Sequence, residues 1–414
     1  MKKIILASIF TLLTACAGHQ RESNQLANLL HQQPPTQVLA QLQSTEPPER
    51  DYAQFHLNVG LLQLLSSDFP AAIASLTQAK KEMAALEAIS ITENAAAGTV
   101  NETLRSYSGY PTDRVMVHNI LALSYLFNDD IDGARVEMLQ ADVSMKKLYS
   151  KGSYNGQLAS THLLSGIIYE MLDEQSNALI SYKHSEEIIQ KRKLSVPVSL
   201  QQALLRLSYR VDRNGQYVSY KQRYSGYPTP VSNNASQVFS LYFDSVVSNK
   251  IEKSILVPSG NGEQLIRISM PAYPNPKYRM ARAKVTDASN QVSTELIENL
   301  EVAVREDLSK EYPSILLLTT TRAIAKYELV AQANEQDSLL GALVNLATAL
   351  SEIADLRSWN MLPATIQFAY LETTDNEVTV DRVSAAQEKI ALNIGSTNLL
   401  LISSLQTPVF HYQQ

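Results

Sequence analysis

Three segments in the first half of the chain repeat one spacing of small and large residues, and this spacing limits the folds open to the sequence. In each segment a small residue is followed 12 positions later by alanine, four positions further by a large apolar residue, and three further by a small one. Small residues let two helix backbones approach closely, and the large residue fills the groove between them. The pattern therefore predicts pairs of antiparallel helices. The three sets are Gly60, Ala72, Leu76 and Ala79; Ala122, Ala134, Met138 and Ala141; and Gly166, Ala178, Tyr182 and Ser185.

This spacing resembles the tetratricopeptide pattern, a helix–turn–helix repeat of ~34 residues. The resemblance implies stacked helical hairpins over residues 51–192 that offer a concave surface to a protein partner. Gly60 and Ala122 lie 62 residues apart, because Ile89 to Arg114 forms a long insertion. Long insertions in repeat proteins often serve binding.

Residues 1–15 have the features of a signal peptide. Two lysines precede an apolar run that is too short to span a bilayer, which needs ~20 residues. The string Leu-Thr-Ala-Cys ending at Cys16 resembles a bacterial lipobox. The resemblance implies cleavage between Ala15 and Cys16, a diacylglycerol on the cysteine sulfur and an acyl chain such as palmitate on its amine. The alternative is that Cys16 is an ordinary residue of a cleaved signal peptide.

Several acyl chains together anchor a protein firmly to a membrane. Ala17 follows the cysteine, whereas lipoproteins kept in the inner membrane commonly carry aspartate there. By resemblance we therefore expect an outer-membrane, lipid-anchored protein that faces the periplasm. Cys16 is the only cysteine of the chain, so no disulfide within the chain supports the fold.

The remaining chain divides by its patterns. Residues 16–50 are polar and contain proline pairs, which predicts a lipidated tether with capping helices. Residues 193–237 are rich in proline, glycine and asparagine and predict a linker. From residue 238, β-rich runs flank helical patterns, which predicts an α+β domain over residues 238–414 with a mostly antiparallel sheet. The helices expected within it are Thr294–Leu308, Ile315–Gln332 and Ser338–Ala354.

Three strings together resemble a family of Gram-negative bacterial lipoproteins with a tetratricopeptide-like N-terminal half. They run from Tyr110 to His118, from Asp132 to Glu137, and from Asp355 to Trp359, the last reading Asp-Leu-Arg-Ser-Trp. The resemblance covers most of the mature chain. The family has no established activity, so the resemblance implies a location and an architecture rather than a reaction.

The hexapeptide Tyr-Ser-Gly-Tyr-Pro-Thr occurs at residues 107–112 and again at 224–229. Either both copies reflect shared turn chemistry, or the two turns form one aromatic surface. Asp113 follows the first copy and predicts a helix N-cap. Arg114 could hold an anionic group of a partner. Tyr107, Tyr110 and Arg114 are therefore candidate binding residues.

A second group of candidates lies near the only tryptophan, Trp359. An Arg357–Asp355 pair beside an indole can bind a ligand or a peptide. Arg322 and Lys326 share a face of a predicted helix and could join them. The alternative, which we favour, is a structural knot in which a buried Arg357 pairs with Asp355 or a carbonyl. The Ala/Leu-rich stretch from Leu339 to Leu356 predicts a core or partner-facing helix.

His56, His118 and His162 each lie four residues before the small residue of their repeat. Equivalent residues of adjacent repeats lie too far apart for metal bonds of ~2.1 Å, so packing sites are favoured over a metal-binding ladder. Phosphate-loop, nucleophile-elbow and dinucleotide patterns do not occur in the sequence. We therefore expect no metal, no cofactor and no catalytic residue. Arg135 is expected to pair with Asp132 or Asp129 at a helix start.

The formal net charge of −6 and the lack of a basic block argue against a nucleic-acid binder. The first functional hypothesis is a non-catalytic periplasmic adaptor or scaffold in cell-envelope assembly or peptidoglycan synthesis. One alternative is a small-ligand-binding protein or enzyme with a site at Asp355, Arg357 and Trp359. Another is a structural envelope protein that self-associates.

Overall fold

The computed structural model describes residues 20–93, 105–150, 153–224, 235–258, 265–276, 279–336, 353–383 and 385–414. A helical stretch over residues 20–29 comes first. The helices that follow are α2 (Pro35–Leu42), α3 (Tyr52–Leu65), α4 (Phe69–Glu93), α5 (Pro111–Phe127), α6 (Ile131–Leu148), α7 (Ala159–Met171), α8 (Gln175–Lys191), α9 (Val198–Val211), α10 (Gln216–Arg223) and α11 (Leu300–Gln336).

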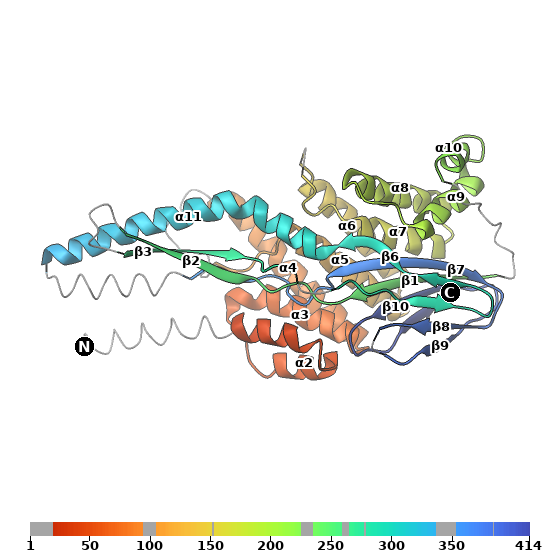
Figure 1. Cartoon of the computed structure of the whole chain (residues 1–414), viewed down its shortest axis with the longest axis horizontal. Helices are drawn as coiled ribbons and strands as arrows, with labels where there is room; N and C mark the ends of the chain where they lie inside the picture. Colours follow the sequence, from red (N-terminus) through yellow and green to blue (C-terminus); the bar gives the residue numbers. More distant parts are fainter. Residues whose placement is uncertain are drawn as a thin grey trace.

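The three predicted helical hairpins are confirmed as α3–α4, α5–α6 and α7–α8 (Figure 1). Their turns are built alike, because each holds a residue with positive φ seven positions after the small residue of its repeat. These residues are Ser67, Asp129 and Asp173. In each turn the next residue donates its backbone N–H to a carbonyl five residues earlier, a bond that satisfies the free carbonyls at a helix end.

The repeated small and large residues meet as the spacing predicts. A Cβ added at Gly60 would lie 2.5 Å from Cγ of Leu76, and one added at Gly166 would lie 2.4 Å from Cε1 of Tyr182. The residues of all three sets in the second helices are buried. Side chains at the two glycines would therefore push the paired helices apart.

The segment predicted as a linker contains two more helices. Residues 193–237 hold α9 and α10, so the helical part extends to Arg223 in the structure. Pro197 stands immediately before α9 and Gly215 immediately before α10. Pro197 and Gly215, two of the residues that suggested a linker, therefore stand at helix starts, where proline and glycine are well tolerated.

The strands form one five-stranded, one four-stranded and one two-stranded sheet in the described residues. The orders are β11-β10-β1-β7-β6, β5-β4-β8-β9 and β2-β3, and β1–β10 is the parallel pair among otherwise antiparallel ones. The expected mostly antiparallel sheet after the helical repeats is thus confirmed. The strands are β1 (Ser236–Asp244), β2 (Ile251–Pro258), β3 (Leu265–Ala272), β4 (Lys284–Thr286), β5 (Gln291–Ser293), β6 (Glu295–Asn299), β7 (Thr365–Thr373), β8 (Glu377–Asp381), β9 (Glu388–Ala391), β10 (Thr397–Ser403) and β11 (Phe410–Gln413).

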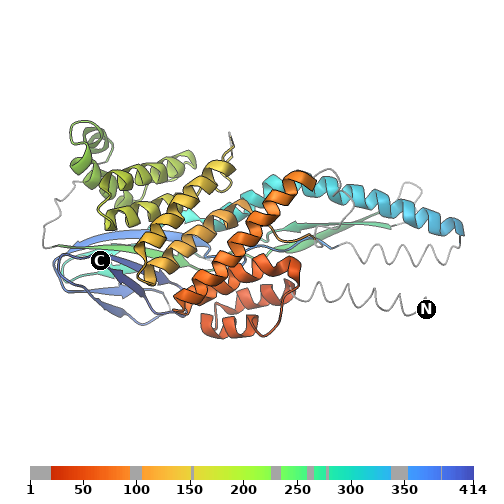
Figure 2. The ribbon, with the colours of Figure 1, turned by 180° about the vertical axis from the view of Figure 1, so that it is seen from behind.

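The five-stranded sheet is buried on both faces. Along β1, Phe239 and Leu241 belong to the same apolar core as the helical repeats. The alternate residues Val238 and Tyr242 belong to a second core shared with the four-stranded sheet. Helices, large sheet and small sheet therefore form three layers, and Figure 2 shows the hairpins in front with the strands behind.

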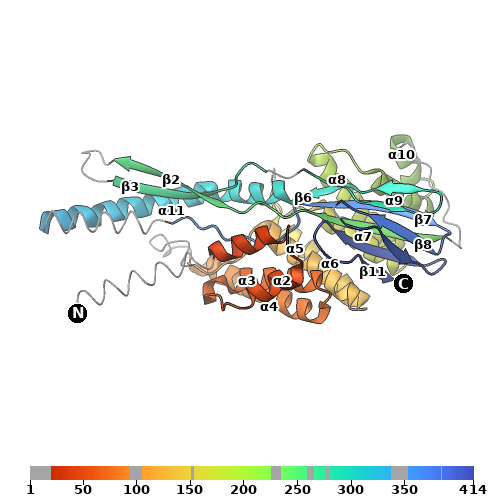
Figure 3. The same cartoon turned by 60° about the horizontal axis from the view of Figure 1, so that its bottom comes forward.

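A projecting arm extends from these layers. It consists of the C-terminal part of α11 and the hairpin β2–β3, which run side by side away from the three layers (Figures 1 and 3). Tyr312 of α11 donates its hydroxyl hydrogen bond to the carbonyl of Pro271 in β3. Two helices were predicted in this region, whereas α11 continues through Pro313 as one helix.

At the starts of three helices, carboxylates from a distant part of the chain accept backbone N–H groups. The residues before α5, α7 and α9 are Tyr110, Leu158 and Pro197, and none makes a side-chain cap hydrogen bond. Carboxylates of β6 and α11 accept these free N–H groups instead. Thr112 donates to Asp307 (2.9 Å), Ala159 to Glu298 (2.6 Å) and Val198 to Glu295 (2.8 Å). One short segment thus holds the first helices of successive hairpins.

The helix predicted over Thr294–Leu308 is wrong in its first part, where the structure has β6. Glu295, Leu296, Glu298 and Asn299 pair with β7. Local propensity favoured a helix here. Pairing with β7 and the hydrogen bonds to distant helix ends stabilise the strand more than this propensity stabilises a helix.

We predict that Glu298 makes stability depend on pH. Burial raises its pKa from 4.5 to about 7, although the N–H groups of Ala159 and Ser160 oppose this. The folded state therefore retains a proton that the unfolded chain loses near pH 4.5. This contribution to the free energy of unfolding is fully present below about pH 4.5 and is lost as the pH rises through 7. Denaturant titrations from pH 4.5 to 7.5 should show that Glu298→Gln flattens the decline by on the order of 1–3 kcal/mol. An unchanged slope would contradict this.

Candidate functional site

Arg357 lies at the centre of a buried polar cluster at the start of α3. Its guanidinium group pairs with Asp51 (Nη1–Oδ1, 3.1 Å) and Asp355 (Nη2–Oδ2, 2.6 Å). It also donates to the backbone carbonyls of Arg50 (3.2 Å) and Arg105 (2.7 Å). The side chain is 7% exposed. Arg357 therefore joins three segments that are far apart in the sequence.

Two of the candidate tyrosines belong to this cluster. The guanidinium carbon of Arg357 lies 5.8 Å from the ring centroid of Tyr107, and the Tyr107 hydroxyl donates a short hydrogen bond to Asp113. Lys250 Nζ lies 3.8 Å from the ring centroid of Tyr110 and donates to the Arg357 carbonyl at 2.8 Å. The structure thus brings Tyr107, Tyr110 and Arg357 together inside the protein.

Burial dominates the electrostatics of the cluster. It lowers the pKa of Lys250 to about 8, although Asp355 and Asp113 oppose the shift. It raises the pKa of Tyr107 well above 10, and the nearby Asp113 adds to this. Burial also raises the pKa of Asp113 despite the hydrogen bonds from Tyr107 and the Tyr110 backbone. These groups pair with one another inside the protein, which is what the structural-knot alternative predicts for Arg357.

The remaining candidates lie elsewhere. Trp359 is 1% exposed and belongs to the main apolar core. Arg322 is buried on α11, where Nη2 donates to Thr319 Oγ1 at 3.2 Å. Arg114 donates from Nε to the carbonyl of Ser108 at 3.1 Å and also lines an open groove. Outside the described residues lie the signal peptide with Ala15 and Cys16, residues 225–229 of the second hexapeptide, the Lys326 side chain, and most of the predicted helices Leu339–Leu356 and Ser338–Ala354.

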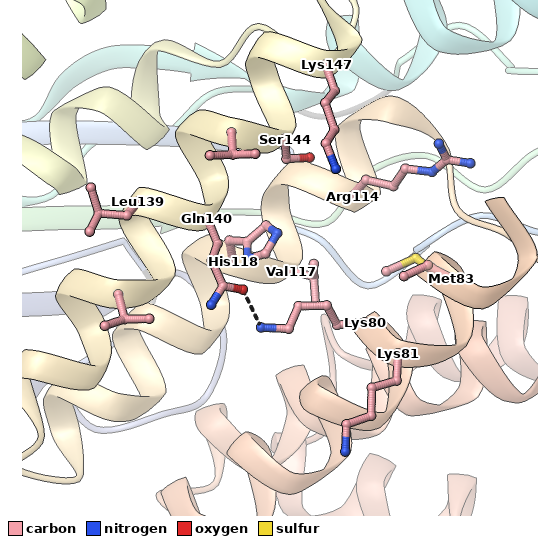
Figure 4. A pocket seen from close by; sticks show the side chains of 13 residues that line it. Lys80, Lys81, Met83, Arg114, Val117, His118, Leu139, Gln140, Ser144 and Lys147 are labelled. Atoms are coloured by element: carbon pink, nitrogen blue, oxygen red, sulfur yellow. Dashed lines mark hydrogen bonds between the residues drawn. The ribbon is translucent and has the colours of Figure 1, made fainter. Parts of the chain in front are cut away.

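The open groove lies between α4 and α6, with α5 as its floor (Figure 4). Its volume is about 560 Å³. Three apolar side chains of α6 are exposed along it at helical spacing: Val136 (48%), Leu139 (43%) and Val143 (51%). The residues that line it are Lys80, Lys81, Met83, Ala84, Arg114, Val117, His118, Val136, Leu139, Gln140, Val143, Ser144 and Lys147.

Positive charges flank the apolar strip of this groove. Lys80 and Lys81 come from α4, Arg114 from α5 and Lys147 from α6 (Figure 4). No acidic side chain occurs among the described lining residues. The surface of the groove thus combines exposed apolar contact area with one sign of charge, which suits a ligand that is both apolar and acidic.

Hydrogen bonds behind the lining fix its walls. Buried Glu137 of α6 accepts from Lys80 of α4 at 2.7 Å, and its other oxygen lies 2.7 Å from His118 Nδ1 of α5. Lys80 also donates to Gln140 at 3.0 Å. Burial alone would raise the pKa of Glu137, but the hydrogen bonds from His118 and Lys80 outweigh it, and the pKa is lowered. Glu137 therefore links all three helices of the groove.

Two local sequence predictions need correction here. Asp113 is the third residue of α5 rather than its N-cap, and its carboxylate accepts the backbone N–H of Tyr110 at 2.9 Å. The helix begins earlier because proline is well suited to a first helical position. Arg135 pairs with Glu174 (2.7 Å) rather than with Asp132 or Asp129, because the next hairpin places that carboxylate within reach.

The three repeat histidines occupy different environments. His118 pairs with Glu137, His162 packs against the ring of His184 (5.1 Å between centroids), and His56 packs against Phe55. Burial lowers the pKa of His162 to about 4, so it is neutral at neutral pH. In the part of the chain that the structure describes, no group of three or more His, Cys, Asp or Glu residues is arranged to hold a metal.

Sequence reasoning missed most of the groove, although α6 carries a signal for it. Ala134, Met138 and Ala141 satisfy the repeat spacing and are buried. Val136, Leu139 and Val143 remain as a second apolar series at positions i, i+3 and i+7. One helix with two apolar stripes must expose one of them or cover it with a partner.

In comparisons with known proteins, no family model and no curated protein matches the chain. Among solved structures, one similar chain is the apo form of RapI, with 15% identity over 46% of this chain and 47% of that one, and a TM-score of 0.34. Another is the Rap conjugation gene regulator of plasmid pLS20 in complex with the Phr* peptide, with 10% identity over 45% of each chain and a TM-score of 0.27. The match thus spans about half of each of these proteins, and it assigns this chain to no family.

Replacing Arg357 by leucine should destabilise the protein strongly. Arg357→Leu leaves Asp51 and Asp355 as uncompensated buried carboxylates, so we expect a loss of about 3–5 kcal/mol in the free energy of unfolding. Arg135→Leu is the matched control, because its pair with Glu174 is roughly one-third exposed and should contribute at most about 1 kcal/mol. Chemical denaturation of both variants measures the difference. Equal losses would show that the buried cluster has no special role.

Proposed function

We propose that the protein is a non-catalytic adaptor that binds a partner protein in the groove between α4 and α6. The groove's exposed apolar strip beside four cationic side chains carries this proposal. Helical repeats commonly bind extended or helical segments in such surfaces. The apolar strip supplies affinity by burial, and the cations select a segment with acidic residues and speed its association.

The rest of the fold supports this choice of surface. The other side of the repeats packs against the five-stranded sheet, where Phe239 and Phe368 share the core of the helices. The concave surface expected from the repeat pattern is thus reduced to the side that the sheet leaves uncovered. Asp355, Arg357 and Trp359 take part in buried internal contacts, which favours the adaptor over a ligand site or enzyme at these residues.

We further propose that the adaptor is a lipoprotein of the outer membrane that faces the periplasm and takes part in envelope assembly or peptidoglycan synthesis. The lipobox-like string before Cys16, Ala17 after it, and the family resemblance support this location. No helix in the described ranges is long and apolar enough to cross a membrane. The lipid would hold the repeats near the membrane, so that the groove meets envelope proteins at high local concentration.

A photo-crosslinking residue at Val143 should capture the partner in cells. Ile180 of α8 is the matched control, because it is 52% exposed and Val143 is 51% exposed. We expect one discrete adduct with an envelope protein from position 143 and none from position 180. Lys147→Glu should reduce the yield of that adduct about tenfold, because it places a negative charge beside an acidic segment. Adducts of equal yield at both positions, or no effect of Lys147→Glu, would contradict the proposal.

The membrane anchor has a separate test. Cys16→Ala, exported by an ordinary cleavable signal peptide, should fail to incorporate radiolabelled palmitate and should leave the membrane fraction, because Cys16 is the residue expected to carry the acyl chains. Fractionation of cells that produce both forms measures this directly. Membrane retention of the Cys16→Ala form would refute the lipid anchor and leave the groove proposal untouched.

A further inference from the structure

The projecting part of α11 exposes an apolar stripe. Leu316 (48%), Leu317 (68%) and Ile324 (60%) are all solvent-exposed. The side of the helix that adjoins one edge of this stripe is buried, with Ile315, Ala323 and Val330 among its residues. The exposed side also carries Ser309, Pro313 and Thr320. In Figures 1 and 3 this part of α11 lies at the edge of the molecule beside β2 and β3.

The described residues that form this stripe, Ser309, Pro313, Leu316, Leu317, Thr320 and Ile324, are uncharged, and the exposed Glu311 lies on the other side of the helix. Lys310 and Glu328, both exposed, stand at its two ends. They lie 18 residues apart, which is about five helical turns, so they point to the same flank of the stripe. One flank of the stripe therefore carries a positive charge at Lys310 and a negative charge at Glu328. The two residues lie about 27 Å apart along the helix axis.

We propose that this stripe binds the same stripe of a second copy, with the two α11 helices antiparallel. A two-fold axis that passes near Thr320 places the same flanks of both helices next to each other. Lys310 of each copy then meets Glu328 of the other, and Ile324 of each copy packs near Leu316 and Leu317 of the other. A parallel arrangement would instead place both charged side chains opposite the other flank of the partner stripe, so that Lys310 and Glu328 would not meet. The charge order of the stripe therefore favours an antiparallel pair of identical chains over a different partner.

This interface is separate from the groove and from the lipid anchor. The groove lies on α4, α5 and α6, so both surfaces can be occupied at once. The pair would present two grooves on one assembly and, where the chains are lipidated, two anchors. Failure of either earlier proposal leaves this one standing, because its test uses an unlipidated chain and no partner protein.

The test begins with a charge exchange in the soluble mature chain carrying Cys16→Ala. Sedimentation equilibrium should give a dimer for this parent chain. Lys310→Glu or Glu328→Lys alone should weaken the dimer about tenfold, because each places like charges opposite each other, and the double variant should restore it. Leu317→Glu should leave a folded monomer, with circular dichroism as the check on folding. Ile180→Glu is the control for an exposed apolar residue outside the stripe and should leave the dimer intact.

Single cysteines test the direction of the pairing. The parent chain with Cys16→Ala contains no cysteine, since Cys16 is the only one. Thr320→Cys lies near the two-fold axis and should form a disulfide-linked dimer under mild oxidation. Ser309→Cys is on the same stripe, but its two copies would lie about 30 Å apart, so it should remain unlinked. A monomeric parent chain at 100 μM would overturn the proposal, and so would linkage of equal yield at both positions.

Discussion

Carboxylates from one short segment accept the free N–H groups at the starts of three helices, and the arrangement of the whole molecule depends on them. Asp307, Glu298 and Glu295 reach α5, α7 and α9, and the residue before each of these helices makes no side-chain cap hydrogen bond. The first helix of each later hairpin is thereby tied to the sheet that follows the repeats. Glu298 and Asp307 are buried. Because burying a carboxylate is expensive without such donors, these two residues and the helix ends that they contact require each other. The sheet that these carboxylates tie to the repeats covers one side of them, and the groove lies on the other side.

The repeat region could be predicted because its information is local. Gly60 with Leu76 and Gly166 with Tyr182 lie 16 residues apart, and the contact they make follows from the spacing of two helices and a turn. The helix ends could not be predicted in the same way, because Glu298 lies 139 residues from Ala159. A signal was nevertheless present: α7 and α9 start after leucine and proline, where a capping residue is usual. At these two helix starts, a carboxylate distant in sequence takes the place of the cap.

The role of the candidate site residues also depends on contacts that are distant in the sequence. The sequence allowed two interpretations of Arg357, and only three-dimensional contacts with Asp51 and the Arg105 carbonyl, 306 and 252 residues away, distinguish them. Tyr107 and Tyr110 gather at the same cluster, so the residues with the most distinctive chemistry stabilise the fold. The groove is instead built from ordinary lysines and valines. Exposure, rather than residue type, identifies it, and exposure is a property of how α4, α5 and α6 pack.

The central claim is that a partner binds the side of the repeats that the sheet leaves open. Amide hydrogen exchange of the mature chain, alone and with the envelope protein that crosslinks at Val143, tests this most directly. We predict new protection confined to α4 and α6, with the first turns of α5, α7 and α9 already slow to exchange in the free chain. New protection at those helix starts or across the five-stranded sheet, with α4 and α6 unchanged, would contradict it.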